Sequence, residues 1–192
     1  MKKNYIAVIM GVALIATMLG GCSQDEATVV EINKQVQPVK TEEATAEGTT
    51  GKKSDLQFVL STTDIDGKIV SLEDFSDAKL IMVNFWEPWC GPCVGEMPDL
   101  EKLYEEYSSD GFVILGIYST DDMDDEVRKV LDSCGTTYPI LKYDEKMEPF
   151  ITDFVPTTIF IDSNGNVLSD EPEIGGKSYD DWKNIIEAYM NR

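Results

Sequence analysis

Two cysteines three positions apart are the residues of this sequence best suited to chemistry. Cys90 and Cys93 follow an apolar run at 80–86 and precede a stretch with helical periodicity, and Gly91 and Pro92 lie between them. If a helix begins at this turn, its unpaired N–H groups and its dipole favour the thiolate of Cys90. Cys93, one turn further on, then attacks any mixed disulfide that Cys90 forms. The spacing predicts a two-electron redox switch.

The same spacing also occurs in half of a structural zinc site, so the supply of further ligands decides between the two. Zinc takes four ligands, most often from cysteine and histidine. The chain has no histidine and only four cysteines. One of these, Cys22, belongs to the N-terminal signal described below, which leaves Cys134 beside the pair. We therefore expect no metal and no cofactor, and the lack of histidine also excludes Cys-His catalysis.

The motif also carries a resemblance to a known family. Trp-Cys-Gly-Pro-Cys at 89–93 is identical to the active-site motif of thioredoxin. Residues 55–192 resemble the extracytoplasmic TlpA/ResA-type thiol–disulfide oxidoreductases. The resemblance implies that Trp89 packs beside the site and shields the sulfurs, whereas the residue type alone would also suit the core. It assigns attack to Cys90 and resolution to Cys93.

Two further positions take their roles from this resemblance. Pro156 matches the cis proline that lies against the redox pair in thioredoxin-like proteins, and the backbone at Val155 would pair with an extended substrate segment. A trans proline at a strand start is the other interpretation of Pro156.

A glutamate after the motif is the candidate proton relay. The buried acid that thioredoxin has before its motif is replaced here by Asn84, which cannot relay a proton. Glu96 matches the glutamate of the Cys-x-x-Cys-x-x-Glu pattern in TlpA/ResA-type proteins, and its carboxylate would exchange a proton with Cys93. A solvated glutamate in the first turn of a helix is the alternative.

The N-terminus has the pattern of a bacterial lipoprotein signal peptide at 1–21. Two lysines precede an apolar run at 5–19, which is shorter than the about 20 residues of a membrane-spanning helix. Small residues directly before Cys22 resemble the lipobox, so that Cys22 would become the lipidated N-terminus. An ordinary signal peptide or an anchor helix is the alternative. Residues 22–54 are polar and predict a flexible tether.

Removing Cys22 from the count leaves three cysteines in an oxidising compartment. An odd number argues against a framework of structural disulfides. Cys134 precedes Gly135 near the expected end of a helix. We expect a buried free cysteine there, with a second resolving cysteine as the alternative.

Composition excludes some classes of partner. The chain of 192 residues has a formal net charge of -20, from 36 acidic and 16 basic residues. A surface this acidic argues against binding to nucleic acid or to an anionic lipid face. Its ordinary meaning is a soluble, self-repelling surface.

The order of the predicted elements defines an α/β fold. Strands are expected at 56–60, 68–71, 80–86, 112–118, 139–141, 155–162 and 167–168, and helical segments at 71–75, after the motif to Tyr107, after 121–126, at 147–154 and at 179–190. This order predicts a mixed central sheet flanked by helices, a thioredoxin-like fold with an added N-terminal hairpin.

Together these features predict a lipid-anchored, extracytoplasmic oxidoreductase that reduces disulfides of exported proteins. The resemblance implies a membrane thiol transporter of the CcdA/DsbD type as electron donor. Apocytochrome c, methionine sulfoxide reductase and cell-envelope proteins are the candidate clients. A thiol peroxidase of the peroxiredoxin type is an alternative, although the Pro-x-x-x-[Thr/Ser]-x-x-Cys pattern is missing before Cys90. A non-enzymatic binding lipoprotein is another, but it leaves Cys-Gly-Pro-Cys unexplained.

Overall fold

A five-stranded mixed sheet lies at the centre of residues 56–120 and 122–192, the part of the chain that the computed structural model describes. The elements in chain order are β1 (Ser61–Thr63), β2 (Ile69–Ser71), η2 (Leu72–Phe75), β3 (Leu80–Phe85), α1 (Gly91–Tyr107), η3 (Ser108–Asp110), β4 (Phe112–Tyr118), α2 (Asp124–Cys134), β5 (Ile140–Lys142), η4 (Glu145–Phe150), β6 (Thr157–Ile161), β7 (Glu173–Ile174) and α3 (Tyr179–Met190). The predicted α/β fold is confirmed. The proposed signal peptide, Cys22 and the tether at 22–54 lie outside the described residues.

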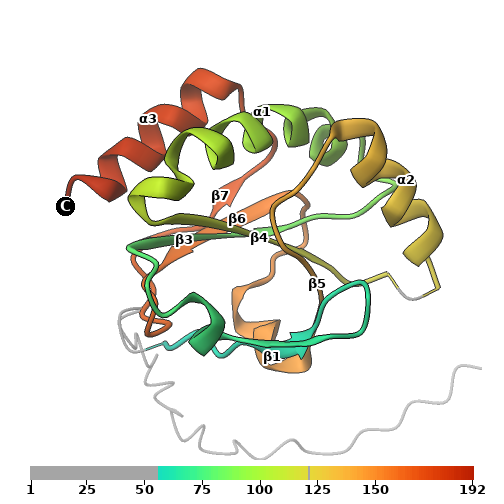
Figure 1. Cartoon of the computed structure of the whole chain (residues 1–192), viewed down its shortest axis with the longest axis horizontal. Coiled ribbons are helices and arrows are strands. Elements are labelled where there is room, and N and C mark those ends of the chain that lie inside the picture. The colour runs from blue at the N-terminus through green and yellow to red at the C-terminus, as the bar shows by residue number, and fades with distance from the viewer. Residues whose placement is uncertain (1–55, 121) are drawn as a thin grey trace, which may run out of the picture. The chain divides into compact units, whose positions relative to one another are not determined.

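Strand β3 occupies the middle of the sheet, whose order is β5-β4-β3-β6-β7 (Figure 1). It pairs in parallel with β4 and antiparallel with β6, so the sheet is mixed as predicted. Every residue of β3 is buried, which agrees with its nearly continuous apolar sequence. Because β3 runs directly into the Cys-Gly-Pro-Cys turn, this strand fixes the place of the redox pair at its carboxyl end.

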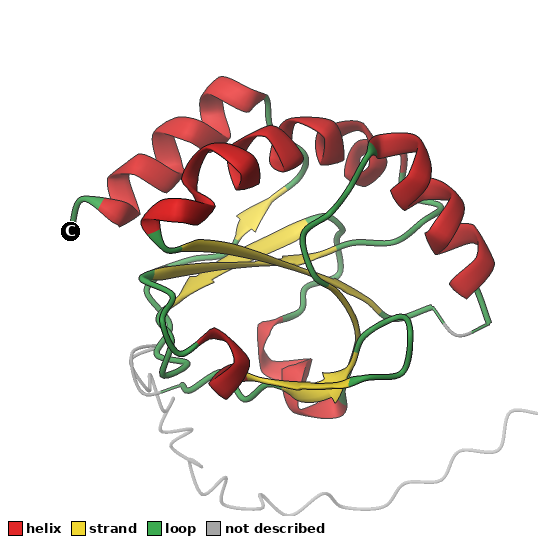
Figure 2. Cartoon of the chain, in the orientation of Figure 1, coloured by secondary structure: helices red, strands yellow, loops and turns green. Residues whose placement is uncertain are grey.

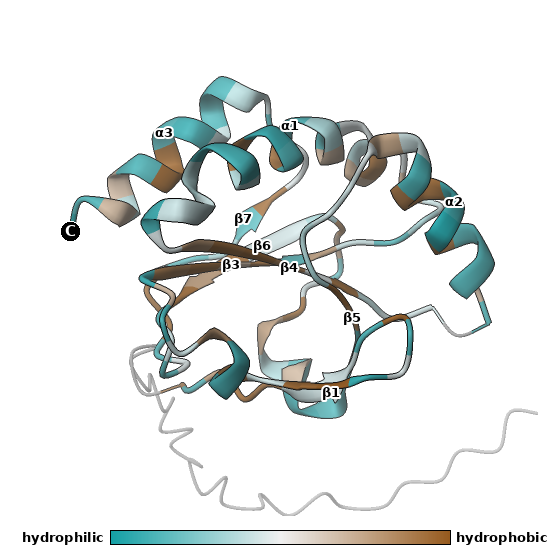
Figure 3. Ribbon diagram, viewed as in Figure 1, coloured by the Kyte–Doolittle hydropathy of each residue, from teal (hydrophilic) through white to brown (hydrophobic). Residues whose placement is uncertain are grey.

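Different elements cover the two faces of the sheet. Helices α1, α2 and α3 lie on one face, and the β1–β2 hairpin lies with η2 and η4 on the other (Figure 2). Strands β3 and β4, between these layers, are strongly hydrophobic (Figure 3). Buried Leu100 and Trp182 fill the helical side, and buried Phe58 and Phe150 fill the hairpin side. Within the described residues, no helix combines the length and apolarity needed to cross a membrane.

The N-terminal hairpin is present, but its first strand lies later than predicted. β2 pairs with Ser61–Thr63 and not with residues 56–60. The strand was predicted at 56–60 because the apolar residues Phe58 and Leu60 alternate with their neighbours as in a strand. Their side chains are buried in the core, whereas Gln57 forms only an isolated bridge with Asn166.

The segment before β1 is held by the turn that follows β6. The N–H of Phe58 donates to the carbonyl oxygen of Gly165 at 2.7 Å, and Gln57 Nε2 donates to the carbonyl of Asn164 at 2.8 Å. A Cβ on Gly165 would lie 2.2 Å from the Phe58 carbonyl oxygen, and its φ is +82°. The close approach and the backbone conformation together require glycine at this position.

The predicted return strand at 167–168 is present only as a short antiparallel pairing with β6 and not as a full strand. Val167 bridges to Ile161, and the N–H of Leu168 donates to the carbonyl oxygen of Phe160 at 2.8 Å. One residue further on, the side-chain oxygen of Ser169 accepts the N–H of Phe160 at 2.7 Å, in the place of a backbone carbonyl. On the side of β6 away from β3, the named strand is β7, which pairs with Thr157 and Thr158.

Candidate active site

Cys90 and Cys93 lie at the N-terminus of α1 and are joined as a disulfide with an S–S distance of 2.06 Å. Cys90 is the N-cap residue, and its sulfur accepts the N–H of Cys93 at 3.2 Å. Gly91 and Pro92 form the start of the helix, where a proline costs no hydrogen bond because the first N–H groups lack partners. Both sulfur residues are buried. The predicted helix N-terminus at the redox pair is confirmed.

The loop before β6 lies against the first sulfur. The Val155–Pro156 peptide bond is cis, as the resemblance implied. Cys90 Sγ lies 3.5 Å from the carbonyl oxygen of Val155. Within the described part of the chain, the backbone N–H and C=O of Val155 enter no backbone hydrogen bond. This arrangement leaves an unpaired backbone segment beside the sulfur.

Glu96 is a buried carboxyl and not the solvated first-turn residue of the alternative interpretation. Its side chain is on α1, and the residue is 4% exposed. Oε2 accepts the indole N–H of Trp182 at 2.9 Å and the backbone N–H of Lys177 at 3.0 Å. Oε1 accepts Asn84 Nδ2 at 3.1 Å. The carboxyl therefore joins α1 to β3 and to the start of α3.

Burial dominates the electrostatics of this carboxyl. It raises the pKa of Glu96 above the ordinary value of 4.5, while the donors from Trp182, Lys177 and Asn84 act in the opposite direction. Asn84 also donates to Thr158 Oγ1 at 3.0 Å, which links Glu96 to β6. A carboxyl with a raised pKa takes up and releases a proton closer to neutral pH than a solvated one does.

Trp89 lies at the surface, so the core interpretation of this residue is wrong. Its side chain is among the exposed large hydrophobic groups, at 63%. The indole Nε1 donates to Thr120 Oγ1 at 3.3 Å, in the loop between β4 and α2. The ring is therefore tied to a neighbouring loop at the edge of the redox turn.

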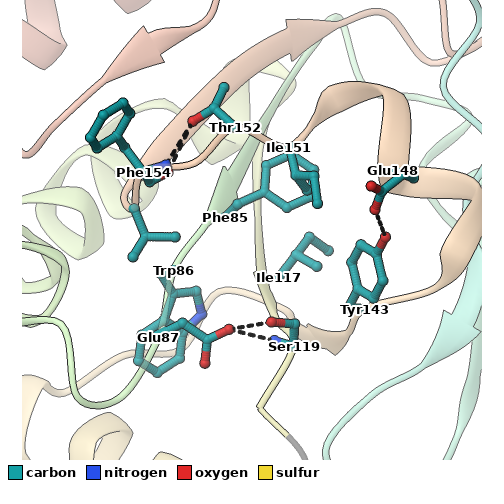
Figure 4. Close-up of a pocket in the computed structure, with 11 residues that line it drawn as sticks. Phe85, Trp86, Glu87, Ile117, Ser119, Tyr143, Glu148, Ile151, Thr152 and Phe154 are labelled. Atoms are coloured by element: carbon teal, nitrogen blue, oxygen red, sulfur yellow. Dashed lines mark hydrogen bonds between the residues drawn. The ribbon is translucent and has the colours of Figure 1, made fainter. Parts of the chain in front are cut away.

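Glu87 is a residue of the site that the sequence analysis missed. It is buried at the end of β3, and its Oε1 accepts the N–H of Ser119 at 2.9 Å and the hydroxyl of Ser119 at 2.5 Å (Figure 4). Oε2 bonds with the hydroxyl of Thr120, the residue that holds Trp89. Its carbonyl also accepts the N–H of Cys90 at 3.0 Å. An acid between an apolar strand and the motif was the only signal of this role.

Cys134 lies at the end of α2 and is half-buried, not fully buried as predicted. Its Sγ lies 3.7 Å from the carbonyl oxygen of Val94 on α1, and it forms no disulfide. In the described residues, no three or more Cys, Asp or Glu side chains are grouped so as to hold a metal ion.

Comparison with known proteins agrees with this geometry. The AhpC/TSA family model matches residues 52–169. Proteins named thiol-disulfide oxidoreductase ResA are similar over most of the chain. The one from Bacillus thuringiensis subsp. konkukian is 31% identical over 132 residues, 68% of this chain and 72% of the relative. The one from Oceanobacillus iheyensis is 32% identical over 139 residues, which are 71% of this chain and 68% of the relative.

Solved structures share the fold. A thiol:disulfide interchange protein of the thioredoxin family from Chlorobium tepidum TLS has a TM-score of 0.60 at 28% identity, over 70% of this chain and 94% of its own. StoA from Bacillus subtilis has a TM-score of 0.54 at 21% identity, over 67% of this chain and 96% of its own. This likeness supports the fold alone. The chain belongs to the AhpC/TSA family and, within the thioredoxin-like fold, is a thiol–disulfide oxidoreductase of the ResA type.

Proposed function

We propose that this protein is a lipid-anchored reductase that transfers electrons to disulfides of exported proteins outside the cytoplasm. The observation that carries the proposal is the Cys90–Cys93 pair at the N-terminus of α1, beside the unpaired backbone of Val155. A sulfur that accepts a helix N-terminal N–H is stabilised as thiolate, which is the attacking form. The unpaired backbone offers an edge on which an extended substrate can align.

The reaction is a dithiol–disulfide exchange in two steps. The thiolate of Cys90 attacks one sulfur of the substrate disulfide, that bond breaks, and the departing substrate thiolate takes a proton. The thiolate of Cys93 then attacks Cys90 Sγ, the mixed disulfide breaks, and the second substrate thiolate leaves and is protonated. The substrate gains two electrons and two protons, and the Cys90–Cys93 disulfide is formed. A membrane thiol transporter of the CcdA/DsbD type returns two electrons to it.

Disulfide reduction is tested directly with insulin. The full chain, reduced with dithiothreitol and freed of the excess, should reduce insulin disulfides in proportion to its own dithiol. Consumption of hydrogen peroxide without insulin reduction would instead support the thiol peroxidase. Activity in neither assay would support a non-enzymatic binding lipoprotein.

The anchor is proposed at Cys22, where a diacylglyceryl thioether supplies two acyl chains and hence stable attachment. We expect cells fed labelled fatty acid to incorporate label into the wild type, and Cys22→Ser to lose both label and membrane association. Cys134→Ser serves as the control and should keep both. A Cys22→Ser protein that still carries label would contradict the anchor.

Glu96 is proposed to take the proton of Cys93 before the resolving step and to return it when the pair is reduced again. Glu96→Gln should slow resolution about a hundredfold or more, since general acid–base groups contribute roughly 10²–10⁴-fold. The measurement is stopped-flow decay of a Cys90 mixed disulfide across pH. Glu105→Gln, an exposed change on the same helix, is the control.

Glu96→Gln should also change how the free energy of unfolding depends on pH. Since burial raises the pKa of Glu96 in the folded protein, the folded state holds this proton more tightly than the unfolded chain does. The contribution of Glu96 is therefore fully present below pH 4.5 and is lost as pH rises through the folded pKa. Relative to Glu96→Gln, the wild type should lose stability over that window. The role would be rejected if the wild type and Glu96→Gln had the same pH dependence of the resolution rate and the same pH dependence of stability.

A further inference from the structure

A small pocket opens beside the redox pair, at the carboxyl ends of β3 and β4 (Figure 4). Its volume is about 210 Å³, and Phe85, Ile117 and Ile151 lie around its interior. Val155 belongs both to this pocket and to the redox centre, because it lines the pocket while its carbonyl lies 3.5 Å from Cys90 Sγ. Whatever occupies the pocket is thus in contact with the residue that faces the attacking sulfur.

We propose that this pocket is a subsite for one bulky apolar side chain of the substrate polypeptide, within two residues of its disulfide cysteine, on a segment that is neutral or basic. The inference rests on the proposed reductase function and adds to it the class of substrate.

Size and lining select the kind of side chain. A volume of about 210 Å³ is below the roughly 300–1,000 Å³ of pockets that hold whole small molecules, so it suits one leucine-, phenylalanine- or tyrosine-sized group. Phe154 stands at its edge and is 63% exposed, which leaves an aromatic face for a partner to cover. Binding removes apolar surface of both the pocket and the substrate side chain from water, which favours such an occupant.

Charge selects the segment that carries the side chain. Glu87 and Glu148 line the pocket, and none of its lining residues is lysine or arginine. Glu148 Oε2 accepts the hydroxyl of Tyr143 at 2.6 Å, so this acid is held at the pocket wall. The chain as a whole carries a formal charge of -20. An acidic substrate segment would be repelled at this position, and a basic one attracted.

The unpaired backbone of Val155 sets the distance from the cysteine. A substrate strand aligned there advances about 3.3 Å per residue, and its successive side chains point to opposite sides. With the substrate cysteine at Cys90, a residue one or two positions away lies beside Val155. That residue is the one whose side chain reaches the pocket.

The test uses peptides with a single cysteine held in a mixed disulfide with 2-nitro-5-thiobenzoate, whose release is followed by absorbance. The peptides carry Phe or Ser within two positions of the cysteine and Lys or Glu further out. The reduced full chain should show a kcat/KM about tenfold higher for Phe than for Ser. At low salt it should favour Lys over Glu about threefold, and added salt should remove this preference.

Two exposed positions provide matched variants. Phe154→Ala should bring the Phe-to-Ser ratio below about threefold, because one wall of the pocket is lost. Ile69→Ala, a change at a 75% exposed residue of the hairpin, should leave the ratio as in the wild type. A wild-type ratio near one, or a ratio unaffected by Phe154→Ala, overturns the subsite and leaves the reductase standing. Failure of the wild type on every peptide and on insulin overturns the reductase function, and the subsite with it.

Discussion

Cys90→Ser is expected to abolish the reduction of insulin disulfides. Cys90 carries the sulfur at the N-cap of α1, and its hydroxyl replacement cannot form a mixed disulfide. The rate of insulin reduction should fall at least about a thousandfold, since loss of a nucleophile lowers the rate by several orders of magnitude. The fold should persist, because serine is among the best N-cap residues. The measurement is insulin precipitation alongside circular dichroism and urea unfolding.

Cys93→Ser is the matched control for this change. It keeps the attacking sulfur of Cys90 and removes only the resolving one, so covalent adducts with substrate should accumulate. In cells, those adducts identify client and donor together by mass spectrometry. If Cys90→Ser kept a substantial fraction of wild-type activity, or if it trapped partners as Cys93→Ser does, the assignment of the nucleophile would be wrong.

Trp182→Ala is expected to be the most destabilising single change near the site. The indole is fully buried between the sheet and the helices, with its ring edge-on to Phe160, and its N–H donates to Glu96 at 2.9 Å. Truncation leaves a cavity and removes one hydrogen-bond donor from the Glu96 carboxyl. Together these changes should lower the free energy of unfolding by about 3–5 kcal/mol. Urea denaturation of the oxidised protein measures the loss.

Trp182→Phe separates the hydrogen bond from the packing. It keeps most of the ring volume but removes one donor from buried Glu96, at a cost of about 1–3 kcal/mol. The pKa of Glu96 should rise further, because a hydrogen bond that lowers it is lost. Trp89→Phe, a change at an exposed ring, should alter stability by no more than about 0.5 kcal/mol. Equal losses for Trp182→Phe and Trp89→Phe would show that the buried bond contributes nothing.

The parts of the fold that were predictable are those set by local pattern. α3 was expected at 179–190 and is found there, because Trp182 and Ile186 mark one buried face. β7 was missed because Glu173–Ile174 has two residues, too few for any periodicity. Its position depends on pairing with β6, which no local signal reports.

The site also has features that local sequence predicts and features that depend on residues far apart in the chain. Cys90 and Cys93 lie within one turn of each other, so their pairing could be predicted from spacing alone. The burial of Glu96 could not, because the donor Trp182 is 86 positions further along the chain. The role of Glu87 depends on Ser119, which only the parallel pairing of β3 with β4 brings close.

The hydrogen bond between Phe58 and Gly165 lies at the end of the sheet opposite the redox pair. Gly165 follows the last residue of β6, Ile161, which is paired with Ile81 near the start of β3, whereas Cys90 follows the end of that strand. The described chain, which begins at Leu56, is therefore held at the end of the sheet remote from the sulfurs, and β6 spans about 16 Å over its five residues. The redox pair therefore lies at the opposite end of the strands from the point where the described chain begins.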